Sequence, residues 1–231
     1  MTTADDKDEI FELRFYNVAA NRDGDMRTRV QNDLKWLFPR HGVRPVGGWS
    51  AISAPSLPMF VYLAPWRNMM VRNKCWGGFY SDPDWQEVRN RTNAGSELVA
   101  DYEIWFLRAI SDWTGFDMAA TGVHEIVFLK TMVGKSVAAA EALRTSEIPA
   151  LERAGAKHVA SFDVMSGGLM PASVSFLTWP DPLARLSSAQ ALENDRELAA
   201  ARQEQKAQFG DTLVGRRGSY LLDPVQVDWD D

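Results

Sequence analysis

Cysteine and long apolar runs are scarce in this chain of 231 residues. Cys75 is the only cysteine, which excludes an internal disulfide and a zinc cluster built from cysteines. No run of about 18 apolar residues occurs, so no membrane-spanning helix is expected. Residues 1–9 are polar and acidic, unlike a secretory signal, and are predicted to be disordered. We therefore expect a cytoplasmic protein without a membrane partner.

Positive charge and histidine are also in short supply. The net charge is −6 and no basic run occurs, which argues against a nucleic-acid partner. The three histidines, His41, His124 and His158, form neither a two-histidine helical motif nor a cluster with carboxylates, so no metal site is predicted. Haem would need an axial ligand such as His124 or His158 and is the less favoured alternative. No glycine-rich phosphate loop or nucleophile elbow is present, and no cofactor is predicted.

Periodic segments, in contrast, are abundant in both halves of the chain. In the first half, strands are predicted at residues 9–19, 43–53, 58–66 and 99–109, and helices at 22–42 and 68–92, the latter broken near Asp82-Pro83. In the second half, strands are predicted at 123–131, 157–166, 172–179 and 216–225, and helices at 137–155 and 182–208. Each half thus has the order β-α-β-β-α-β of the ferredoxin-like unit.

The two halves look like an internal repeat. A shift of 113 residues places Glu12 on Glu125 and Trp66 on Trp179. We therefore predict an α+β fold with two ferredoxin-like repeats, residues 10–112 and 123–225. The repeats are expected to pack sheet to sheet as an intramolecular α+β barrel. Two domains lying side by side are the alternative.

Several stretches of the first half resemble a known family. "FELRFYNV", "RHGVRPVGGW", "FVYLAPW" and "FYSDPDW" are similar to segments of the NIPSNAP family, in the dimeric α+β barrel superfamily. The second half keeps a degraded version in "HEIVFL", "RAGAKHVASF" and "LENDREL". The resemblance implies a barrel in which the two halves act as two protomers. Its superfamily includes cofactor-free monooxygenases, isomerases, cyclases, haem enzymes and proteins without known activity, so fold does not settle function.

The first strand supplies the candidate catalytic residues. Alternation in "FELRFY" places Phe11, Leu13 and Phe15 on one face, predicted to meet the helices. The other face, predicted to line the barrel interior, carries Glu12, Arg14 and Tyr16. There Glu12 would act as acid or base, while Arg14 and Tyr16 hold a developing oxyanion. The structural alternative is that Glu12 pairs with Arg14 or acts as a staple repeated at Glu125.

Strand aromatics supply the candidate binding residues. Trp49, Tyr62, Trp66 and Trp105, together with Glu125, are predicted to line an apolar pocket. Each tryptophan has core packing as its ordinary alternative, and Trp66 in particular is repeated as Trp179.

Two functions follow from these predictions. The first is a cofactor-independent enzyme that acts on a small apolar or aromatic molecule by oxygenation, isomerisation, cyclisation or elimination. The second is a non-catalytic barrel that binds a small molecule or a protein, and an internal cavity of about 300 Å³ or more would distinguish them. Because the repeats replace the usual dimer, a monomer or a loose homodimer is expected.

Overall fold

A computed structural model of the chain describes residues 9–111, 115–119 and 121–229. They divide into two compact units, described separately below. The first unit comprises residues 9–108, 116–119 and 223–229, and the second comprises most of the chain between them. The predicted disordered segment 1–9 lies outside the described residues except for Glu9. No helix among the described residues has the length and apolarity needed to cross a membrane.

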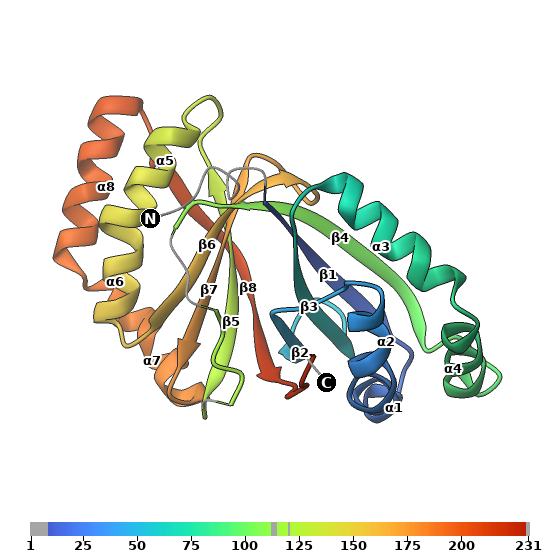
Figure 1. Ribbon diagram of the computed structural model, residues 1–231. Coiled ribbons are helices and arrows are strands. Elements are labelled where there is room, and N and C mark those ends of the chain that lie inside the picture. Colours follow the sequence, from blue (N-terminus) through green and yellow to red (C-terminus); the bar gives the residue numbers. More distant parts are fainter. Residues whose placement is uncertain (1–8, 112–114, 120, 230–231) are drawn as a thin grey trace. The chain divides into compact units, whose positions relative to one another are not determined.

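The first unit is a four-stranded antiparallel sheet with helices on one face (Figure 1). Its elements are β1 (Ile10–Val18), α1 (Asp23–Thr28), η2 (Arg29–Leu34), α2 (Lys35–Arg40), β2 (Gly47–Ser53), β3 (Met59–Trp66), α3 (Met69–Ser81), α4 (Pro83–Asn93) and β4 (Val99–Ala109). The strand order is β4-β1-β3-β2, with β1 paired to both β3 and β4. This is the predicted β-α-β-β-α-β order.

Local signals in the sequence explain where the helices of this unit begin. The Asn68 side chain accepts a hydrogen bond from the Val71 backbone N–H and starts α3. Asp82 accepts from the Asp84 N–H and starts α4, with Pro83 in the first turn, where a missing N–H costs nothing. Helical backbone runs on from α1 through the π-helical turn η2 into α2, so one long predicted helix became three consecutive segments.

The second unit repeats this arrangement. Its elements are β5 (Val123–Thr131), α5 (Ser136–Ala142), η3 (Leu143–Glu147), α6 (Ile148–Arg153), β6 (Lys157–Ser166), β7 (Ala172–Trp179), α7 (Pro182–Glu193), α8 (Arg196–Phe209) and β8 (Val214–Pro224), in the strand order β8-β5-β7-β6. The predicted helical stretch 182–208 is confirmed, but it is divided into two helices at Asn194 and Asp195. Asp195 leaves the helical conformation and caps α8 by accepting from the Leu198 N–H at 2.8 Å, as Asp82 caps α4.

Two polar contacts recur at equivalent places in the two units. The Trp66 indole donates to Glu12 Oε2 at 2.9 Å, and the Trp179 indole donates to Glu125 Oε2 at 2.8 Å. On the helices, Arg40 pairs with Asp82, and Arg153 with Asp195. The predicted repeat is therefore a repeat of contacts as well as of elements.

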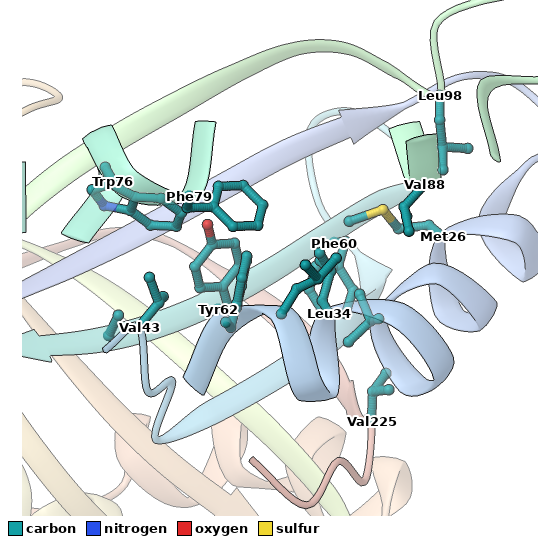
Figure 2. Close-up of a cluster of buried hydrophobic side chains, with 14 of the residues drawn as sticks. Met26, Leu34, Val43, Phe60, Tyr62, Trp76, Phe79, Val88, Leu98 and Val225 are labelled. Atoms are coloured by element: carbon teal, nitrogen blue, oxygen red, sulfur yellow. The ribbon is translucent and has the colours of Figure 1, made fainter. Parts of the chain in front are cut away.

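The core of the first unit fills the space between its sheet and helices. Figure 2 shows Tyr62 and Phe60 of β3 beneath Trp76 and Phe79 of α3, with Leu34 of η2 beside them. Ring contacts hold this layer together; Phe38, for example, lies 5.1 Å from Phe79 and 5.5 Å from Trp76 between ring centroids. The sheet face under the helices is thus aromatic as well as aliphatic.

Candidate functional site

The polar face of β1 meets the helices, which corrects the predicted orientation. Glu12 and Arg14 contact α3, whereas Phe11, Leu13 and Phe15 lie on the opposite face of the sheet. Alternation shows that two faces differ, but both faces of β1 are buried, so it does not show which one the helices cover. The polar set is tolerated beneath α3 because that helix supplies matching polar groups.

Glu12 is a carboxylate surrounded by donors. Arg14 Nε donates to Oε1 at 2.8 Å, and Arg72 of α3 donates to both oxygens at 2.6 and 3.1 Å. The indoles of Trp66 and Trp76 both donate to Oε2 at 2.9 Å. Burial alone would raise the pKa of Glu12, but the bond from Arg72 and the charge of Arg14 outweigh it and lower the pKa below 4.5. The carboxylate is ionised, and its lone pairs are occupied.

Arg14 connects this carboxylate to a group of phenols. Arg14 is 2% exposed, and its guanidinium lies 4.1 Å from the centroid of the Trp76 ring. Nη1 donates to the Tyr16 hydroxyl at 2.8 Å and to the Tyr80 hydroxyl at 3.3 Å. The Tyr16 and Tyr62 hydroxyls lie 3.0 Å apart. Charge and phenol therefore form one continuous network on the helix-covered face.

The direction of the hydrogen bonds in this network follows from their count. Burial raises the pKa of Tyr62 well above its ordinary value, so its phenol keeps its proton. Either hydroxyl of the Tyr16–Tyr62 pair can be the donor. We assign it to Tyr62, because that residue is 2% exposed and its hydrogen would otherwise be buried without an acceptor, whereas Tyr16 borders a pocket. Arg14 also donates to Tyr16, which fills both acceptor positions of that oxygen. The Tyr16 hydrogen then has no acceptor among the described residues.

Tyr16 lies in the wall of a pocket of about 320 Å³ within the first unit. Helix residues Met26, Leu34, Phe38, Trp76, Phe79 and Trp85 make most of its apolar wall. Tyr80 of α3 and Tyr102 of β4 add two further phenol rings. The volume is that of a site for a small organic molecule. Tyr16 is the least exposed of the three phenols that line it, and the hydrogen of its hydroxyl is uncommitted.

The structure divides the aromatics that the sequence grouped into one pocket. Tyr62 and Trp66 lie on the helix-covered face, behind Tyr16 and Glu12 respectively, and neither lines the pocket. Trp49 packs its ring against Phe116 on the opposite face of the sheet. Trp105 lies there too, 5.7 Å from Phe15 between ring centroids. These residues are not brought together.

Glu125 belongs to the second unit and is a buried staple. It receives the Trp179 indole and pairs with Arg185 at 2.8 Å and with Arg216. Arg185 and Arg216 take the place that Arg14 and Arg72 hold around Glu12. No phenol corresponds to Tyr16 here, because the equivalent position is Leu129. The tyrosine network is therefore specific to the first repeat.

Sequence reasoning missed Arg29, a charged residue of the same pocket. It begins η2, is 4% exposed, and donates to Thr92 Oγ1 and to Asn93 Oδ1, both at 2.7 Å. One feature of the sequence could have indicated that Arg29 is buried. Arg29 stands three residues after Met26, on the border of the apolar stripe of its helix.

The histidines do not fit a haem site at this pocket. His41 contacts Asp82 at 2.6 Å beside α4, and His158 of β6 contacts Ser161 at 2.9 Å in the second unit. His124 is buried on β5, also in the second unit. None of the three lines the pocket of the first unit, so that pocket offers no imidazole to a haem iron.

Comparison with solved structures shows the fold of the whole chain. An anthrone oxidase-like protein gives a TM-score of 0.64 at 11% identity, covering 97% of this chain and 94% of that one. A proposed monooxygenase from Lactobacillus acidophilus NCFM gives 0.57 at 10%, covering 95% of each chain. A chlorite dismutase variant from Candidatus Nitrospira defluvii gives 0.55 at 8%, covering 97% and 94%. No curated protein matches the sequence.

These likenesses and the strand order place the chain in the class of α+β barrel proteins with two ferredoxin-like repeats, as the sequence predicted. The family model of the NIPSNAP proteins matches residues 11–111. The first repeat is a NIPSNAP domain, and it is the repeat that carries the pocket.

Proposed function

We propose that the NIPSNAP domain binds a small, mainly apolar or aromatic molecule in the pocket beside Tyr16. The bound molecule places an oxygen atom next to the Tyr16 hydroxyl and accepts its hydrogen. One observation carries this proposal: the hydroxyl hydrogen of Tyr16 has no acceptor among the described residues, and the residue lines a cavity of about 320 Å³. A ligand with an acceptor oxygen completes the network.

We further propose that the protein is a cofactor-independent enzyme of the oxygenase, isomerase, cyclase or lyase type. Reactions of these types that pass through an enolate or a phenolate place negative charge on a substrate oxygen, and a donor held in place stabilises it. Tyr16 is that donor. Arg14 and Tyr62 position it and, through their bonds to its oxygen, offset the charge that the oxygen gains as its proton moves toward the substrate.

The identities of the structural neighbours support the same class. One is named as a proposed monooxygenase and another as anthrone oxidase-like, the latter after a polycyclic aromatic ketone. An aromatic ketone has the acceptor oxygen and the flat apolar body that the pocket suits. Glu12 has no part in the proposed chemistry, because its oxygens are occupied by Arg14, Arg72, Trp66 and Trp76.

Competition against a fluorescent probe tests the role of Tyr16. Phenylnaphthylamine, a neutral dye that brightens in apolar pockets, reports occupancy. Two competitors of similar shape are compared, acetonaphthone with a carbonyl oxygen and ethylnaphthalene without one. In the wild type, acetonaphthone should displace the dye more effectively. In Tyr16→Phe that advantage should shrink about fivefold, corresponding to one hydrogen bond of about 1 kcal/mol, while ethylnaphthalene is unaffected.

A tyrosine variant in the second unit provides the control. Tyr220→Phe should leave both competitors unchanged, because Tyr220 belongs to the second unit. Equal behaviour of acetonaphthone in the wild type and in Tyr16→Phe would refute the role of Tyr16. Once a substrate is found, Tyr16→Phe separates the two functions: an enzyme loses turnover, whereas a binding protein loses affinity alone.

A further inference from the structure

Arg29 is a buried cation without a carboxylate partner among the described residues. The residue is 4% exposed, and its side-chain hydrogen bonds go to the Thr92 hydroxyl and the Asn93 amide oxygen, which are both neutral. Buried charges in proteins are ordinarily paired, because an uncompensated one costs several kcal/mol. Arg14, the other buried arginine of this unit, has Glu12 as its partner.

The acidic residues near Arg29 pair with other arginines, although the second oxygen of Asp33 is buried without a hydrogen-bond partner. Asp33 pairs with Arg91 at 2.6 Å, and Glu97 pairs with Arg89 at 2.6 Å. The Arg22 guanidinium lies close by and bonds to the Thr92 and Asn93 carbonyl oxygens. Burial, followed by the charges of Arg22 and Arg89, lowers the pKa of Arg29 to about 10, so it is still charged at neutral pH. The surroundings therefore favour a negative group beside it.

The Arg29 guanidinium also has N–H groups that make no hydrogen bond to the described residues. A guanidinium carries five N–H groups, and the two bonds of Arg29 use Nε and one hydrogen of Nη2. Both hydrogens of Nη1 and one of Nη2 are left, and they form the end of the fork that binds a carboxylate with two parallel bonds. Arg29 lines the same cavity as Tyr16.

We infer that the ligand of this pocket is an aromatic or apolar carboxylate, whose anionic group binds Arg29. This inference rests on the proposed function and adds the substrate class to it. Arg29 supplies the anchor at one position of the cavity, Tyr16 meets a second oxygen, and Met26, Phe79 and Trp85 enclose the apolar body. The bound carboxylate neutralises a charge that the fold leaves unpaired.

A matched pair of competitors tests the inference on the unmodified protein. Naphthoate and naphthamide have the same aromatic body, and only naphthoate carries a negative charge. With phenylnaphthylamine as the reporter, naphthoate should displace the dye at concentrations about tenfold lower or more, as expected for a charge-assisted bond to a buried guanidinium. Equal displacement by the two compounds would overturn the inference.

Variants locate the effect at Arg29. Arg29→Gln should abolish the advantage of naphthoate over naphthamide, whatever its effect on the dye. Arg144→Gln, which removes an exposed charge in the second unit, should keep the advantage. If Arg29→Gln keeps it too, the inference is wrong. The wild-type comparison stands even if Arg29→Gln fails to fold.

The dye separates this inference from the proposed function beneath it. Dye binding without any preference for naphthoate would refute the carboxylate and leave the pocket in place. If neither the dye nor the naphthalene compounds bind, the pocket itself is refuted, and the carboxylate with it.

Discussion

Replacing Glu12 by glutamine should destabilise the first unit severely. The change removes the charge that compensates Arg14, which is 2% exposed, and places an amide N–H₂ among donors from Arg72, Trp66 and Trp76. Breaking one partner of a buried ion pair costs about 3–5 kcal/mol. Because whole domains have only about 5–15 kcal/mol of stability, Glu12→Gln should remove a large part of it.

The repeat offers a matched comparison within the same chain. Glu125→Gln breaks the equivalent carboxylate, but the side chains of Arg185 and Arg216 are 16% and 33% exposed and keep contact with water. Its cost should therefore be smaller, about 1–3 kcal/mol, chiefly for the lost hydrogen bonds to a charged group. The order of the two costs follows from burial alone.

Urea unfolding measures both variants. Tryptophan fluorescence mainly reports the first unit, which holds most of the tryptophans, while far-ultraviolet circular dichroism reports both units. The fluorescence midpoint should fall steeply in Glu12→Gln and little in Glu125→Gln. A loss below about 1 kcal/mol in Glu12→Gln, or a larger loss in Glu125→Gln, would refute the view that Glu12 is the main polar staple of the unit.

Three further predictions concern stability. The folded-state pKa of Glu12 lies below 4.5, so its contribution to stability is fully present above that pH and is lost as the pH falls through the folded-state pKa. The difference in stability between the wild type and Glu12→Gln should therefore disappear in acid. A difference that grows in acid would contradict this. Asn68→Ala removes the cap of α3 and should lower the free energy of unfolding by about 1 kcal/mol, which urea unfolding measures. An unchanged free energy would show that the cap does not stabilise the helix. Gly47→Ala places a Cβ 2.3 Å from the fully buried Trp49 ring and should cost about 1–3 kcal/mol; a neutral result would mean that the ring moves freely.

Element order was predictable because its signals are local. Strand β4 at Val99–Ala109 and β7 at Ala172–Trp179 have the predicted limits, and the break before Pro83 is at the predicted place. The break at Asp195 was missed, although Asp195 corresponds to Asp82 under the repeat shift. A single capping residue within a helix-favouring stretch gives little local signal. The break could have been predicted only by comparing Asp195 with Asp82 of the first repeat.

The orientation of β1 was not predictable, because it depends on residues distant in the sequence. Alternation in "FELRFY" separates two faces, and both are buried. The donors on Arg72 and Trp76, about sixty residues later, make the polar face suit the helix layer. Hydrophobicity alone favoured the opposite assignment.

The pocket depends even more on the tertiary fold. Tyr16, Arg29, Tyr80 and Tyr102 come from four different elements. Only Tyr16 was singled out from the sequence. The sequence did show that Tyr16 has no counterpart in the second repeat, where Leu129 stands. That asymmetry was the usable indication that the chemistry lies in the first repeat.

Filling the pocket tests the central claim most directly. Ala100 lines the cavity and is exposed on β4, so Ala100→Trp should fill the space without disturbing the core. Phenylnaphthylamine titration of the wild type should give saturable binding at one site per chain, and Ala100→Trp, with an unchanged unfolding midpoint, should abolish it. Identical titration curves for the two proteins would contradict the assignment of this pocket as the binding site.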